Sequence, residues 1–95
     1  MESAYILAAE DDDFTRDMLD TILGSTGIKF DLAVDGNDAV SKFKGKNGGY
    51  TLVLLDLQMP NKDGCSAAKD IRQIESSSGW KKCKIYGVSA GLFSS

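Results

Sequence analysis

The chain has 95 residues, of which 42% are hydrophobic and 26% charged, and its formal net charge is −3. These values predict one folded domain, exclude a second domain, and argue against a disordered chain. The basic residues form no stripe, which argues against direct nucleic-acid binding, and no apolar run is long enough to span a membrane. The first residues lack the positive charge of a signal peptide, so the sequence predicts a cytoplasmic protein.

The sequence contains two cysteines and no histidine. Two cysteines are too few for a disulfide scaffold, and without histidine they cannot complete an ordinary zinc site. The missing histidine also excludes the Ser-His and Cys-His nucleophile pairs. Any chemistry must therefore use carboxylates, hydroxyls, lysines and a metal ion. Cys65 and Cys83 are predicted to be unpaired thiols at opposite edges of the sheet described below.

Strands and helices are predicted to alternate along the first half of the chain. A buried strand over 5–9 is followed by a helix that Asp13 caps, and its predicted inward residues are Met18, Leu19, Ile22 and Leu23. This helix is expected to end at the glycines near 24–27. A second strand over 28–34 precedes a second helix, whose predicted inward residues are Ala39, Val40 and Phe43.

The second half continues this alternation. The most apolar run, over 52–55, ends at Asp56 and predicts a central strand. In the loop over 59–64, Met59 is expected to anchor the loop, and Gly64 is able to take a positive φ. A third helix is then marked by Ala67, Ala68, Ile71 and Ile74, before a polar linker over 75–82 whose Trp80 is expected to cover the lower edge of the sheet. A fourth strand is predicted over 85–88.

Strands that alternate with helices imply right-handed crossovers and a parallel sheet with helices on both faces. Functional residues are then expected beyond the carboxyl ends of the strands. Three strands are followed there by polar residues: Glu10 and Asp11, Asp56, and Ser89. Converging carboxylates repel one another unless a hard cation neutralises them, and Mg²⁺ prefers oxygen ligands. The sequence therefore predicts a magnesium site, at which a carboxylate is able to attack phosphorus.

Four segments of the sequence resemble the receiver domains of two-component signalling, in the order found in that family: ILAAEDDDFTRDML, AVDGNDAV, LVLLDLQMPNKDG and KIYGVSAG. The resemblance implies a flavodoxin-like, doubly wound parallel sheet with strand order 2-1-3-4, in a single receiver domain over 1–95. It also implies that Asp56 accepts a phosphoryl group from a histidine kinase or a phosphotransfer protein. Such a domain is a signalling phosphoacceptor with Mg²⁺ as cofactor, and not an enzyme.

The resemblance assigns roles to further residues. Asp11, Asp56 and the backbone carbonyl of Gln58 would bind the metal directly, and Glu10 would bind it largely through water. Ser89 would donate a hydrogen bond to the phosphoryl group, and the small side chain of Ala90 would leave room for it. Asp12 and Asp13 are expected to be capping or solvated residues.

The chain departs from the family after Ser89, because only six residues follow it. Receiver domains continue into a fifth strand, which ends in a lysine that pairs with the phosphoryl group, and then into a last helix. A domain without these elements would expose the edge of its fourth strand, and an open edge pairs readily with another chain. The sequence therefore predicts one of two outcomes. Either the chain self-associates through that edge and through the exposed side of the first helix, or it is a fragment whose remainder another polypeptide supplies.

Two other functions stay open. The first is a receiver-derived interaction module that binds partners without phosphate, which the missing lysine favours. The second is a phosphohydrolase of the haloacid dehalogenase type, because the order Asp11, Asp13 and Thr15 after a strand resembles that family, with Ser89 as its second motif. In that enzyme Asp11 would be the nucleophile, and Asp56 with its Met-Pro loop would have no role.

Overall fold

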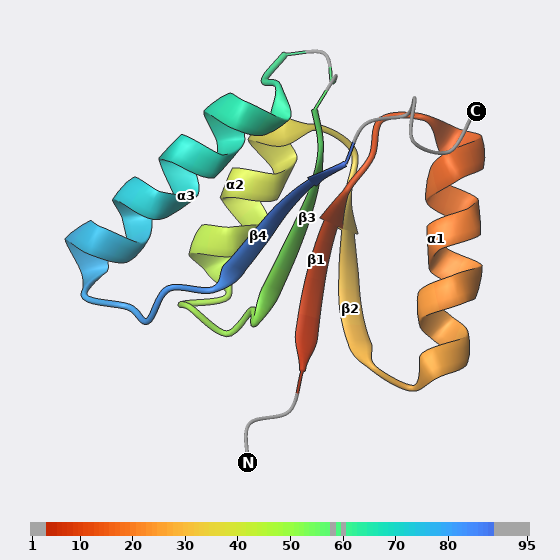
Figure 1. Ribbon diagram of the computed structural model, residues 1–95, viewed down its shortest axis with the longest axis horizontal. Coiled ribbons are helices and arrows are strands. Elements are labelled where there is room, and N and C mark those ends of the chain that lie inside the picture. The colour runs from red at the N-terminus through yellow and green to blue at the C-terminus, as the bar shows by residue number, and fades with distance from the viewer. Residues whose placement is uncertain (1–3, 58, 60, 89–95) are drawn as a thin grey trace.

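The computed structural model describes residues 4–57, 59 and 61–88. Strands and helices alternate as predicted, in the order β1 (Tyr5–Ala9), α1 (Asp13–Thr26), β2 (Lys29–Ala33), α2 (Gly36–Gly45), β3 (Leu52–Asp56), α3 (Gly64–Ser78) and β4 (Lys84–Val88). The four strands form one parallel sheet in the order β2-β1-β3-β4. Figure 1 shows α1 on one face of the sheet and α2 with α3 on the other. The predicted fold class and strand order are confirmed.

The register of the sheet aligns the carboxyl ends of its two central strands. Ala9, the last residue of β1, pairs with Ala33 of β2 and with Leu55 of β3. Asp56 then ends β3 and pairs with Val88 of β4. The residues that follow β1 therefore lie next to Asp56, at one edge of the sheet. β4 is an outer strand of the described sheet, and the self-association expected at its edge stays a prediction.

Most of the hydrophobic core lies between the sheet and the helix pair α2 and α3. Phe43 of α2 and Ile71 of α3 are buried there against sheet residues such as Leu7 and Val53. Met59 also belongs to this cluster, so it anchors the loop after β3 as predicted. Trp80 packs on Phe43, with ring centroids 6.0 Å apart, beside the loop that leads into β3.

The other face of the sheet has a smaller core, and two predicted inward residues of α1 are exposed there. Leu23 is buried and Leu19 is partly buried against the sheet, as predicted. Met18 and Ile22, however, are 48% and 55% exposed, and Phe14 is 72% exposed. The prediction was wrong for Met18 and Ile22, because the apolar stripe of α1 is wider than the part of the helix that the sheet covers. No second helix of the described chain packs beside α1 on this face (Figure 1).

The ends of α1 differ from the prediction. Asp12, and not Asp13, caps the helix: its carboxylate accepts a hydrogen bond from the backbone N–H of Thr15 at 2.8 Å. The helix runs through Gly24 to Thr26, and Gly27 ends it with a φ of 76°. A glycine inside a helix costs about 1 kcal/mol relative to alanine, which did not stop a helix whose inner face is held by the sheet.

Helix α3 is also longer than predicted. The expected polar linker began at Glu75, but the helix continues to Ser78, and Gly79 ends it with a φ of 71°. Glu75 is buried, with 1% of its surface exposed. Its carboxylate accepts hydrogen bonds from Arg72 and from the backbone N–H of Cys83, both at 2.8 Å. These partners make its burial possible and tie α3 to the segment before β4.

Both cysteines are free thiols, Cys65 exposed at the start of α3 and Cys83 buried before β4. Burial, and the nearby carboxylate of Glu75, raise the pKa of the Cys83 thiol to about 12. Cys83 is therefore a protonated, unreactive core residue at neutral pH. Among the described helices, none is both long and apolar enough to cross a membrane.

Candidate functional site

Hydrogen bonds to neighbouring residues hold the acidic segment after β1 in place. The N–H of Glu10 donates to the carbonyl of Ala33 at 3.0 Å, which extends the pairing of β1 with β2 by one residue. The Glu10 carboxylate accepts a hydrogen bond from the N–H of Asp12 at 3.1 Å, and its backbone carbonyl accepts one from Arg16 at 2.9 Å. The turn from β1 into α1 is thus fixed on both sides of Asp11.

Three carboxylates meet at this turn. One oxygen from each of Glu10, Asp11 and Asp56 lies within 4.8 Å of the others. Asp56 is 7% exposed, while Asp11 is exposed to solvent. Three predicted site residues are therefore brought together from β3 and from the segment after β1, as the alignment of the strand ends implied.

The ionisation of Glu10 reflects this crowding. The pKa of Glu10 is raised to about 7, first by burial and then by the carboxyl groups of Asp56 and Asp11, although the hydrogen bond from Asp12 lowers it. A cluster of like charges favours either a bound proton or a bound cation. The donor set consists of carboxylate oxygens, which suits a hard divalent ion such as Mg²⁺, and Glu10, Asp11 and Asp56 are the residues that would hold it.

The neighbouring aspartates take the roles expected of them. Asp12 is the helix cap described above, and hydrogen bonds from Thr15 lower its pKa. Asp13 forms an ion pair with Arg16, and its side chain is 89% exposed. Neither belongs to the carboxylate cluster. Three other predicted site residues lie outside the described part of the chain, so their positions are untested: Gln58, Ser89 and Ala90.

The loop after Asp56 is fixed by two glycines. A Cβ atom on Gly64 would lie 2.5 Å from the carbonyl oxygen of Asp56, and one on Gly36 would lie 2.2 Å from that of Lys62. Only glycine permits both approaches. Gly64 does not use its ability to take a positive φ; among the described residues of this loop, Asn61 has a positive φ, at 69°. The need for Gly64 is close packing and not backbone conformation.

Asp35 connects this loop to the start of α2. Its side chain caps α2 by accepting from the N–H of Asp38 at 2.8 Å, and it accepts a second hydrogen bond from Asn61 at 2.8 Å. These two hydrogen bonds lower the pKa of Asp35. Sequence reasoning identified the turn at Asp35 but missed the link to Asn61, since the two residues are far apart in the chain and carry no joint motif.

An apolar groove opens directly beside the carboxylate cluster. It has a volume of about 700 Å³ and is lined by the acidic turn, by Leu54 and Val88 of the sheet, and by the exposed stripe of α1, which consists of Phe14, Met18 and Ile22. The site therefore combines a charged end with an apolar surface of a kind that often contacts another protein.

The family model of the response regulator receiver domain matches residues 6–91. The oxidative stress response two-component system protein SSK1 of Candida albicans is 36% identical over 75 residues, which cover 79% of this chain and 11% of that protein.

Two solved structures are similar along most of the chain. One is a complex of the Saccharomyces cerevisiae histidine phosphotransfer protein Ypd1 with the receiver domain of Ssk1, at 30% identity and a TM-score of 0.78, covering 93% of this chain and 63% of that one. The other is the CheX–CheY–BeF₃–Mg²⁺ complex of Borrelia burgdorferi, at 30% identity and a TM-score of 0.79, covering 92% and 62%. This chain thus spans less than two thirds of either solved relative. From its fold, the arrangement of its strand-end carboxylates and the match over most of its length, the chain belongs to the response regulator receiver domain family.

Proposed function

We propose that this chain accepts a phosphoryl group on Asp56 from a phosphohistidine, carried by a histidine kinase or a histidine phosphotransfer protein. The observation that carries the proposal is the meeting of three carboxylates at the end of the two central strands, with Asp56 the most buried of them. Membership of the receiver family supports it. So does the apolar groove beside the cluster, which offers a surface for the donor protein.

The three carboxylates are proposed to bind the metal ion, and Asp56 is proposed to react as well. Asp11, Asp56 and Glu10 would hold Mg²⁺, which when bound neutralises negative charge on the phosphoryl oxygens. Asp56 ends β3 and is packed under Gly64, so its backbone is held firmly. A firmly held backbone helps to position the Asp56 carboxylate, and positioning is the main contribution of a protein to phosphoryl transfer.

In the proposed reaction a carboxylate oxygen of Asp56 attacks phosphorus. The new O–P bond forms as the P–N bond of the phosphohistidine breaks, and the imidazole nitrogen of the donor leaves with the electron pair of that bond. The product is an acyl phosphate on Asp56. Ser89 is proposed to donate a hydrogen bond to the transferred group, Ala90 to leave space for it, and the carbonyl of Gln58 to complete the metal site.

The donor protein is proposed to dock on the groove along α1. The solved Ssk1 receiver domain binds a histidine phosphotransfer protein. In this chain the groove runs from the acidic cluster along Phe14 and Met18, so a partner seated on it would have its reactive histidine close to Asp56. Exposed aromatic and methionine side chains are common in such contacts.

The test is intact mass after treatment with acetyl phosphate. With Mg²⁺ the wild-type chain should gain one phosphoryl group, and with a chelator it should gain none. Asp56→Asn should abolish labelling, and Asp11→Ala should remove both labelling and Mg²⁺ binding measured by calorimetry. Asp20→Asn, an exposed change on α1, is the matched control and should label normally. Full labelling of Asp56→Asn would contradict the assignment.

The same experiment separates the other two functions. An interaction module would show no labelling at all, and a phosphohydrolase would release phosphate over many turnovers and depend on Asp11. The geometry favours Asp56 as the nucleophile, because it is the buried member of the cluster. Asp13, the second acid that the phosphohydrolase pattern needs, is paired with Arg16 away from the cluster.

A further inference from the structure

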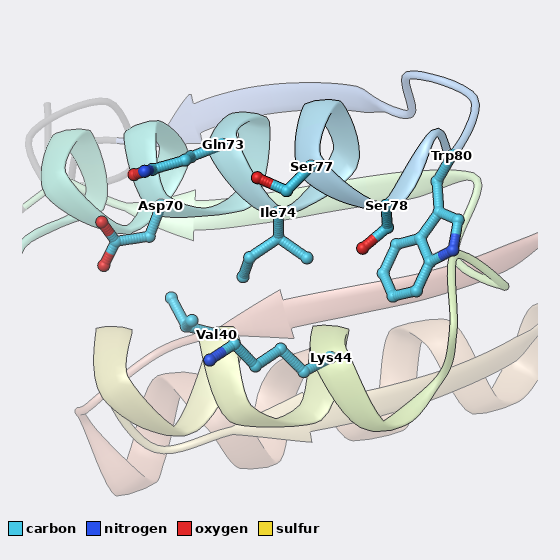
Figure 2. A pocket seen from close by; sticks show the side chains of 8 residues that line it. All are labelled: Val40, Lys44, Asp70, Gln73, Ile74, Ser77, Ser78 and Trp80. Atoms are coloured by element: carbon cyan, nitrogen blue, oxygen red, sulfur yellow. The ribbon is translucent and has the colours of Figure 1, made fainter.

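A second groove, with a volume of about 550 Å³, lies between α2 and α3. It is on the opposite face of the sheet from α1 and shares no residue with the acidic site or its apolar groove. Figure 2 shows the side chains that line it: Val40 and Lys44 from α2; Asp70, Gln73, Ile74, Ser77 and Ser78 from α3; and Trp80 from the segment after α3.

The floor of this groove is apolar and fixed. Val40 and Ile74 are partly buried and pack against the main core. Trp80 stands at one end of the groove (Figure 2), where Phe43 supports its ring. Gly48 leaves room for the indole, because a Cβ atom there would lie 3.1 Å from the ring. The ring is therefore a preformed wall that a ligand can contact without first ordering it.

The polar groups around the floor give the groove a local positive charge. Asp70 is neutralised by Lys62, whose Nζ lies 2.5 Å from its carboxylate. Other lysines of this region are paired, Lys42 with Asp38 and Lys46 with Asp31. Lys44, in contrast, forms no ion pair or side-chain hydrogen bond with any described residue.

The remaining polar groups of the groove are also available. Ser77, Ser78 and Gln73 are exposed, and within the described chain their side chains donate no hydrogen bonds. An unpaired lysine beside an apolar floor suits an anion with an apolar part, and the chain as a whole carries a charge of −3. The local charge of the groove is thus opposite in sign to the net charge of the chain.

We propose that the groove between α2 and α3 binds a small amphipathic carboxylate, an aliphatic or aryl-alkyl acid. Its hydrocarbon part would lie on Val40, Ile74 and the Trp80 ring, and its carboxylate would accept a hydrogen bond from Lys44. The volume is in the range of small-molecule sites. The groove along α1 is the more apolar of the two, but it is bordered by Glu10, Asp11 and Asp12, so it repels the same ligand.

The test uses the full chain, with Trp80 as the reporter, because it is the only tryptophan. Hexanoate and 4-phenylbutyrate, up to about 10 mM, should change its fluorescence saturably. The corresponding amides should bind about tenfold more weakly, since they lack the charge. Lys44→Met should cause a similar loss for the acids and leave amide binding unchanged. Lys69→Met, an equal charge change at an exposed position of α3 outside the groove, is the matched control.

Three outcomes would overturn the proposal. The first is no saturable change in fluorescence, and the second is equal affinity for acid and amide. The third is a set of backbone amide shifts, measured by NMR, that centres on Phe14 and Met18, which would place the ligand in the groove along α1. The expected result is a set of shifts that centres on Val40, Ile74 and Trp80 and that needs about tenfold more acid in Lys44→Met.

Discussion

Glu75 shows how a single buried charge depends on its partners. Burial alone would raise its pKa, but hydrogen bonds from Cys83 and Arg72 outweigh that effect and hold the pKa below its ordinary value. A carboxyl with a depressed folded pKa stabilises the protein above its unfolded pKa, and this contribution is lost as the pH falls through the folded value.

Glu75→Gln should therefore destabilise the chain by about 1–3 kcal/mol at pH 7, because Cys83 and Arg72 lose a charged acceptor. Urea denaturation at pH 7 and at a series of lower pH values measures this. The difference between wild type and variant should shrink as the pH falls through the folded pKa of Glu75, which lies below its ordinary value, because Glu75 of the wild type is then protonated. Asp17→Asn, an exposed change on α1, should show little effect at either pH.

Glu10 has the opposite pH dependence. Its pKa is raised from 4.5 to about 7, so between these values the folded state holds a proton that the unfolded state has lost. Stability must then fall as the pH rises through this window. In the presence of a chelator, Glu10→Gln should raise the melting temperature at pH 8 by about 2–4 °C, a small effect because the site is partly exposed. This gain in melting temperature should disappear at pH 4 and should be reduced by Mg²⁺. A variant that is less stable than wild type at pH 8 would contradict repulsion between the carboxylates of the cluster.

At the scale of elements, two glycines should respond to alanine in opposite directions. Gly24 lies inside α1 with open space around its missing Cβ, so Gly24→Ala should stabilise the chain by about 0.5–1 kcal/mol. Gly36→Ala would force a Cβ against the backbone of Lys62 and should cost about 1–3 kcal/mol. Thermal unfolding of both variants checks this. Equal changes in stability would show that the loop between Asp56 and α3 can move to make room for the added Cβ.

The strands could be predicted closely from sequence, whereas the buried faces of the helices could not. An apolar run that stops at a charge, such as Leu52 to Asp56, marks both the strand and its end. Which apolar residues of α1 are covered depends on how far the sheet extends beneath it, and Met18 and Leu19 look alike in sequence. Glu75 was placed in a linker because its main partner is a backbone N–H, which leaves no sequence signal.

The candidate site was predictable to the same extent as the strands that build it. Glu10, Asp11 and Asp56 each follow or end an apolar run, so parallel pairing alone brings them together. The cap at Asp12 could not be chosen over Asp13 from composition, because four acids stand in a row. The packing of Gly64 on Asp56 depends on the path of the loop, which local sequence does not specify.

For the molecule as a whole, the exposed stripe on α1 is expected to contribute to docking of the donor protein and little to the stability of the fold. Met18→Gln should change the free energy of unfolding by less than about 0.5 kcal/mol, because the side chain is already half exposed. Leu23→Ala, at a buried position of the same helix, should cost about 2–5 kcal/mol. Met18→Gln should also slow phosphoryl transfer from a phosphohistidine protein while leaving acetyl phosphate labelling unchanged. Equal losses with both donors would show that the stripe does not receive the donor protein.

The central position of β1 also has a consequence for how the chain acquires its structure. β1 is synthesised before the other three strands, yet it pairs with β2 on one side and with β3 on the other. The hydrogen bond from the N–H of Tyr5 to the side chain of Thr51 spans 46 positions. Contacts between such distant residues slow folding, because a long loop must close before they form. During synthesis on the ribosome, β1 therefore stays open on one side until β3 has emerged, and the carboxylate cluster cannot exist before that moment.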